Sequence, residues 1–236
     1  MTVHREDSAK SPTLDDAIFL AAQSHHGQKD KAGFPYILHV LEVMFRSVSN
    51  EEMITACLHD ILEDTSVTVD ALKQLGYPPK IIEAVELLTW KKEQETYEEY
   101  IKKVKSNKLA ATIKRTDLAS HLTPCLTGGP NWLERHYPEL AKRYRWAQTE
   151  LNRWKVLERD AFDPDAEAYT KGEYATETQA VHAAYQYLEH LEKTQPTSQS
   201  RGQSREGLQD RVYVESPNGA VRRILPRQAR NSPYIR

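Results

Sequence analysis

The stretch LHDILEDTS, residues 58–66, carries four side chains that can do chemistry: His59, Asp60, Glu63 and Asp64. The second pair follows the first by four positions, so on a helix the two pairs lie one turn apart on one side. Burying an unpaired carboxylate costs several kcal/mol unless positive charge compensates it. Imidazoles and carboxylates together are a donor set for a divalent cation, and we therefore predict a metal site at this segment.

Two residues elsewhere in the sequence could complete such a site. His39 lies within the apolar run PYILHVLEV, and Asp117 lies within TIKRTDLASHL. Two imidazoles and two carboxylates suit Mn²⁺, Fe²⁺, Zn²⁺ or Mg²⁺, with the remaining positions open to water or to a substrate oxygen. The set contains no thiolate, which excludes a structural zinc finger.

Each of these residues also has a purely structural interpretation. His39 could be a hydrogen-bonded core histidine, and Asp117 could form an ion pair with Lys114 or Arg115. The carboxylates at 63–64 could cap the next element or face solvent. The metal site therefore requires that the side chains of three distant segments meet in the fold.

Helical periodicity dominates the first two thirds of the chain. Apolar residues recur at helical spacing near 14–26, 35–48, 50–64, 68–76, 79–88, 97–104 and 109–118, and a long helix is expected from 133 to about 157. Residues 160–175 are expected to form a loop, and 177–193 one more helix. Residues 211–225 resemble a small hairpin that turns at Asn218-Gly219. We predict an all-α fold with a C-terminal extra helix and a short β-hairpin tail.

The composition describes a globular chain with a basic end. The 236 residues are 39% hydrophobic and 28% charged, and their formal net charge of −2 argues against a general polyanion binder. From Arg201 onward the chain has eight Arg, no Lys, two Glu and one Asp, a net charge of +5. Contact with nucleic acid is expected only through this tail, and a solvated basic extension is the simpler interpretation.

The cellular setting follows from what the sequence lacks. It has two cysteines, Cys57 and Cys125, and no 18-residue apolar run or N-terminal apolar segment. We therefore predict a cytoplasmic protein in a reducing compartment, without a membrane span.

Four blocks of the sequence carry a family resemblance. His39, the HD pair at 59–60 and Asp117 together are similar to the H…HD…D signature of HD-domain metal-dependent phosphohydrolases. The blocks HGQKDKAGFPYILH, LHDILEDT, LLTWKKEQETYEEYI and IKRTDLASHL resemble the hydrolase domain of RelA/SpoT proteins. The metazoan SpoT homologue and small bacterial HD proteins are similar too. The resemblance covers roughly residues 14–155, with the blocks in the same order.

This resemblance implies an HD-domain helical bundle at 1–158, a loop and accessory helix at 159–195, and a basic polar linker with the hairpin at 196–236. It implies one Mn²⁺ held by four residues: His39, His59, Asp60 and Asp117. Glu63 and Asp64 would then handle the hydrolytic water. The best-known reaction of the family removes the 3′-pyrophosphate from ppGpp and pppGpp, so a nucleotide is the expected substrate.

Two departures from the family pattern bear on the substrate. A common Arg-Lys pair is replaced by Asp30-Lys31, which leaves Lys31 to meet a phosphate. The usual Asn four residues after the last metal aspartate is His121, which could contact substrate. The expected function is thus metal-dependent hydrolysis of a (p)ppGpp-type pyrophosphate ester. The alternatives are hydrolysis of another phosphorylated small molecule and a non-catalytic nucleotide sensor.

Overall fold

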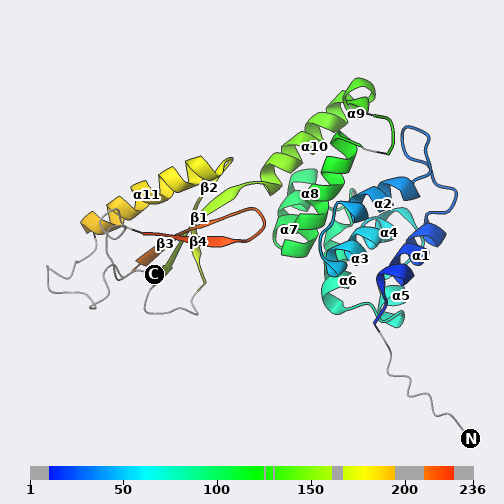
Figure 1. Ribbon diagram of the computed structural model, residues 1–236, viewed down its shortest axis with the longest axis horizontal. Coiled ribbons are helices and arrows are strands. Elements are labelled where there is room, and N and C mark those ends of the chain that lie inside the picture. The colour runs from blue at the N-terminus through cyan, green and yellow to red at the C-terminus, as the bar shows by residue number, and fades with distance from the viewer. Residues whose placement is uncertain (1–10, 125, 130, 161–166, 195–209, 226–236) are drawn as a thin grey trace, which may run out of the picture. The chain divides into compact units, whose positions relative to one another are not determined.

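A computed structural model describes residues 11–124, 126–129, 131–160, 167–194 and 210–225. The chain divides into two compact units, 1–151 and 152–236 (Figure 1). The first unit is built from helices, and the second combines a sheet with one helix. The domain boundary that the sequence suggested at 158 falls within a strand of the second unit.

The described part of the first unit contains ten helices. They are α1 (Leu14–Ser24), α2 (Ile37–Phe45), α3 (Asn50–Leu58), α4 (Ile61–Asp64), α5 (Val69–Gln74), α6 (Pro79–Leu88), α7 (Tyr97–Lys105), α8 (Lys108–Leu122), α9 (Trp132–His136) and α10 (Pro138–Leu151). Local chemistry sets several starts, because Thr13, Ser49 and Thr96 each close a capping box ahead of α1, α3 and α7. The helices predicted from periodicity between 14 and 122 are present, except that the one predicted at 50–64 is divided into α3 and α4.

One apolar core lies between these helices. It buries Val40 of α2, Leu58 of α3, Val85 of α6 and Ile113 of α8 among many others. Burying a side chain of this size contributes about 1.5–3 kcal/mol, so the core can hold a few costly polar groups in place. Helices α2, α3 and α8 pack against one another. This packing brings together three segments that are far apart in the sequence.

The helix that carries the LHDILEDTS motif is broken at its centre, whereas the sequence suggested one continuous helix. Helix α3 ends at Leu58, and α4 begins at Ile61. Asp60, between them, has φ −108° and ψ 2°, a sparsely populated region where active-site residues are often found. The break directs the side chains of His59 and Asp60 differently from a regular helix.

The prediction of an all-α fold was wrong. The second unit contains the strands β1 (Trp154–Asp160), β2 (Tyr169–Tyr174), β3 (Asp210–Glu215) and β4 (Val221–Ile224). They form one antiparallel sheet in the order β2-β1-β3-β4. The long helix expected from 133 to about 157 is instead α9, α10 and the start of β1, and the loop expected at 160–175 includes β2. Strand β1 pairs on one side with β2, the next strand in the chain, and on the other with β3, which is distant in sequence. No local pattern reveals the second pairing.

Helix α11 (Glu177–Thr194) packs against the four strands, and its predicted range of 177–193 is confirmed (Figure 1). Ala184 and Leu188 meet Val156 and Val214 in a second apolar core. The predicted hairpin is present as β3 and β4, with Gly219 at φ +80° in the turn. It does not stand alone, since β3 also pairs with β1. Of the segment 196–236, predicted as a basic polar linker with the hairpin, residues 196–209 and 226–236 lie outside the described residues.

None of the helices described in the structure combines the length and the apolarity needed to cross a membrane.

Candidate metal centre

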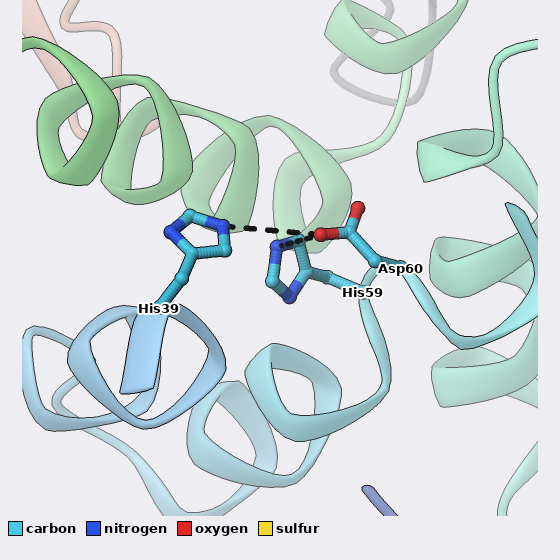
Figure 2. A group of neighbouring side chains, drawn as sticks. All are labelled: His39, His59 and Asp60. Atoms are coloured by element: carbon cyan, nitrogen blue, oxygen red, sulfur yellow. Dashed lines mark ion pairs between the residues drawn. The ribbon is translucent and has the colours of Figure 1, made fainter. Parts of the chain in front are cut away.

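Side chains from three segments of the first unit converge at one point. His39 comes from α2, His59 and Asp60 from the break after α3, and Asp117 from α8. His39 Nε2 lies 3.3 Å from Asp117 Oδ1 and 3.8 Å from Asp60 Oδ2. His59 Nε2 lies 2.8 Å from Asp60 Oδ2 and 3.8 Å from Asp117 Oδ1. Figure 2 shows the side chains of His39 and His59 beside the Asp60 carboxylate.

The outer nitrogen of each imidazole is held by the surrounding helices. His59 Nδ1 lies 2.7 Å from the carbonyl oxygen of Ala56, which can only accept, so Nδ1 carries the proton. His39 Nδ1 lies 3.2 Å from Ser120 Oγ on α8. In both residues Nε2 faces the point of convergence, which is the arrangement found in metal-binding histidines.

Three atoms at this point make no hydrogen bond to the described residues, although each lies within ion-pair distance of another member of the cluster. His39 Nε2, His59 Nε2 and Asp117 Oδ1 are all buried without a hydrogen-bond partner. An unpaired buried polar atom costs about 1–3 kcal/mol, and such atoms are rare in folded proteins. Donor atoms about 2.1 Å from a shared cation would be separated by about 3–4 Å. Asp117 Oδ1 lies 3.3 Å from His39 Nε2 and 3.8 Å from His59 Nε2, which agrees with such a separation. The residues therefore fit a divalent cation.

The electrostatics of the site agree with that fit. Burial, followed by the charge of His121, lowers the pKa of His39 to about 4. This imidazole is therefore neutral at neutral pH and can offer its nitrogen lone pair to a cation. Burial alone would lower the pKa of His59, but the Asp60 and Asp117 carboxylates outweigh it and raise the pKa to about 9. Burial would raise the pKa of Asp60, yet His59 holds it well below its usual range. The site attracts positive charge.

The Asp117 carboxylate is shared between a lysine and this centre. Lys114 Nζ lies 2.8 Å from Asp117 Oδ2, so the ion pair considered as an alternative is present. It occupies one oxygen only, and Oδ1 remains directed toward the histidines. The ion pair and the metal site therefore do not exclude each other.

Glu63 and Asp64 lie on α4, just past the helix break. Glu63 Oε2 accepts a hydrogen bond of 2.9 Å from the Trp90 amide, and Oε1 lies 3.1 Å from Lys92 Nζ. The Asp64 carbonyl accepts a hydrogen bond of 2.7 Å from Gln28 Nε2, and Asp64 lines the cavity in front of the centre. Partial burial and then the neighbouring carboxylates raise the pKa of Asp64, which favours uptake of a proton.

The loop between α1 and α2 separates the roles of Asp30 and Lys31. Asp30 Oδ1 accepts hydrogen bonds from the backbone amides of Ala32 and Phe34, both at 2.9 Å. Asp30, which stands where the family pattern has a cation, thus stabilises the loop to which it belongs. Lys31 lines the cavity and is exposed.

His121 also lies at the cavity, one turn after Asp117 on α8. Its Nε2 is 3.2 Å from Asp117 Oδ1, and its ring stacks on that of His39 with centroids 4.3 Å apart. The substrate contacts assigned to Lys31 and His121 from the sequence stay predictions.

The cavity has a volume of about 570 Å³ and lies within the first unit. Its floor is the cluster of histidines and carboxylates. Its walls carry five cations, which are Lys29, Lys31, Lys92, Lys114 and Arg143. They also carry six aromatic residues, which are Tyr36, Trp90, Tyr97, Tyr100, Trp132 and Tyr144. Positive charge on the walls favours binding of an anionic ligand, and the carboxylates of the floor favour binding of a metal cation beneath it.

One wall residue, Tyr36, was missed by reasoning from the sequence. Its hydroxyl donates a hydrogen bond of 2.5 Å to Asp60 Oδ2, and its position three residues before His39 could have indicated this contact. Arg143 belongs to the segment 142–155, whose mixed charges suggest a mainly solvated face, and the sequence suggested it only as a residue that could reach a nucleotide. Its guanidinium lies 5.2 Å from the Trp90 ring centroid and 4.8 Å from that of Tyr97.

Known proteins that are similar to this chain bear on the same site. No protein-family model matches it. The guanosine-3′,5′-bis(diphosphate) 3′-pyrophosphohydrolase of Aquifex aeolicus is 38% identical over 65 residues, which are 26% of this chain and 9% of that protein. The bifunctional (p)ppGpp synthase/hydrolase SpoT of Escherichia coli is 34% identical over 85 residues, 34% of this chain and 12% of that protein. The chain resembles the RelA/SpoT hydrolases.

The RelA/SpoT resemblance is partial. The matched segment spans about a tenth of the length of the curated relatives. A solved structure, described as a metazoan orthologue of SpoT that hydrolyses ppGpp, is 24% identical. The match covers 59% of this chain and 88% of that chain, with a TM-score of 0.44. So distant a likeness carries no conclusion, and the chemistry must be argued from the residues.

Proposed function

We propose that this chain is a metal-dependent phosphohydrolase that removes a pyrophosphate group from a nucleotide of the (p)ppGpp type. The observation that carries the proposal is the meeting of three buried atoms that make no hydrogen bond to the described residues, His39 Nε2, His59 Nε2 and Asp117 Oδ1, at the floor of a cation-lined cavity. The partial RelA/SpoT resemblance supports the choice of substrate class.

His39, His59, Asp60 and Asp117 would hold the cation, and Mn²⁺ suits their nitrogen and oxygen donors. A divalent cation at such a site stabilises the negative charge that develops on a phosphoryl group and makes water more acidic. Tyr36 and Lys114 fix the carboxylates of Asp60 and Asp117, respectively, through the hydrogen bond and the ion pair described above. These two contacts leave the floor preorganised.

Asp64 is the proposed general base. Its carboxylate lines the cavity and its pKa is raised, so it can take a proton from the attacking water. Glu63 lies next to Asp64 on the same short helix and helps to hold that helix in place. Since the Trp90 amide and Lys92 bind both Glu63 oxygens, Glu63 anchors α4, and Asp64 is the carboxylate that would exchange protons.

The walls of the cavity match a nucleotide polyphosphate. Lys31, Lys92 and Arg143 offer positive charge to phosphate oxygens. Trp90 is partly exposed at the cavity, where a base could stack on its ring or on the Arg143 guanidinium beside it. A volume of about 570 Å³ lies in the range of pockets that hold small ligands.

The test is a hydrolysis assay on the full chain loaded with Mn²⁺. The substrate panel contains ppGpp, pppGpp, other nucleotides and simple phosphate monoesters, with separation of the products. The proposal expects release of pyrophosphate from ppGpp or pppGpp. Asp64→Asn should abolish turnover and still bind metal, whereas His59→Ala should lose the metal. Absence of product from the guanosine pyrophosphates, with product from another phosphate ester, would favour the alternative substrate class.

A further inference from the structure

His121 lies within the candidate centre rather than at its edge. Its Nε2 is 3.2 Å from Asp117 Oδ1, the same oxygen that lies 3.3 Å from His39 Nε2. Potential ligand atoms of His39, Asp117 and His121 all lie within 4.8 Å of one another. The same limit holds for His39, His59 and Asp60. The described donors thus form two groups that share His39.

The two groups cannot hold two separate ions through His39. Its Nδ1 lies 3.2 Å from Ser120 Oγ, so only Nε2 is directed toward either group. An imidazole nitrogen has one lone pair and binds one metal at a time. Only one ion could therefore bind at His39 Nε2, and it would have to lie between the two groups to be bound by both.

The geometry points to His121 as a fifth protein ligand of one divalent cation, alongside His39, His59, Asp60 and Asp117. This inference rests on the metal site of the proposed function. It assigns to His121 a direct bond to the ion instead of the substrate contact that the sequence suggested. The centre then has three imidazoles and two carboxylates.

The surroundings of His121 hold its ring in place for that role. The ring stacks on His39 at an interplanar angle of 22°, and its centroid lies 5.2 Å from that of Tyr144. The side chain is 28% exposed, against 5% for His39 and 1% for His59. His121 therefore closes the centre on its cavity side, where an ion would otherwise meet only solvent or substrate.

A third imidazole changes what the centre binds. Imidazole donors suit Zn²⁺, Fe²⁺ and Ni²⁺, whereas carboxylate and water suit Mg²⁺. His121→Asn should therefore weaken binding of Zn²⁺ more than binding of Mg²⁺. Five protein ligands would leave less of the ion open to a water or substrate oxygen than four would.

The decisive experiment counts coordinated imidazoles in the full-length protein loaded with Mn²⁺. Pulsed electron paramagnetic resonance, compared between natural-abundance and ¹⁵N-histidine protein, resolves the nitrogens bound to the ion. We expect three in the wild type and two in His121→Asn, with a Zn²⁺ affinity lower by roughly tenfold or more. Ser120→Ala is the matched control, because it removes only the partner of His39 Nδ1. It should weaken binding while leaving the count at three.

The outcomes separate this inference from the proposed function. Two coordinated imidazoles in the wild type, unchanged in His121→Asn, would overturn the role of His121 and leave the four-ligand centre intact. A wild-type protein that binds no divalent cation would overturn both. A count of three that falls to two supports the inference whether or not the guanosine pyrophosphates are hydrolysed.

Discussion

The substitution Lys114→Met tests how the buried Asp117 carboxylate is compensated. Burial would lower the pKa of Lys114, but Asp117 raises it well above its usual range. Burial would raise the pKa of Asp117, but Lys114 and then His121 hold it well below its usual range. Both groups are therefore charged at neutral pH, and the 2.8 Å ion pair is buried, with side chains 14% and 3% exposed. Methionine keeps the length of the side chain and removes the charge.

The expected loss follows from that burial. Removing one partner of a buried ion pair costs about 3–5 kcal/mol, because the other charge is left uncompensated. We expect the lower end, about 3 kcal/mol, since His121 Nε2 also lies 3.2 Å from the Asp117 carboxylate. For a domain of this size that loss lowers Tm by roughly 6–12 °C.

The assay is thermal and urea unfolding at neutral pH, with chelator and with saturating Mn²⁺. The deficit should be largest with chelator and should shrink with Mn²⁺, because the cation compensates the same carboxylate. Lys73→Met is the matched control. Its ion pair to Asp70 spans 3.5 Å between side chains that are 61% and 83% exposed, and its removal should change stability by no more than about 0.5 kcal/mol.

Two results would refute this reasoning. A loss with chelator no larger than that of Lys73→Met would mean that Asp117 does not depend on Lys114. A deficit of equal size with and without Mn²⁺, in a protein that binds the ion, would mean that the cation does not compensate Asp117.

Asp30→Ala should speed hydrogen exchange at the Ala32 and Phe34 amides, which now bond to Asp30 Oδ1; unchanged rates would contradict the loop-closing role. Cys57 is fully buried and burial raises its pKa to about 12, so peptide mapping should find it unmodified by iodoacetamide at about pH 8 unless urea is added. Because the pKa of Asp64 is raised, kcat/KM should fall on the acid side at a pH above the usual pKa range of an aspartate. The substitution Glu63→Gln removes a nearby negative charge and should move this fall in kcat/KM to lower pH.

Much of the first unit could be predicted because its signals are local. Capping residues such as Thr13 and Ser49 act within one turn, and apolar spacing reports the buried face of a helix. His39 and Asp117 could be singled out for the same reason, since a polar side chain within an apolar run must have a partner. In the second unit, local signals predicted the helix at 177–193 and the hairpin of β3 and β4. Strands β1 and β2 were missed, because their structure depends on pairing within the sheet.

Local sequence signals were enough to predict most of the helices before residue 122, the donor set and the resemblance that suggested its chemistry. Three features became visible only once the helices were packed: α3 ends just before Asp60, Lys114 pairs with one oxygen of Asp117, and His121 stacks on His39. His39 and Ser120 stand 81 positions apart yet lie side by side. Capping and periodicity act between neighbours in the chain, whereas the meeting of these side chains depends on how α2, α3 and α8 pack, which no local pattern records.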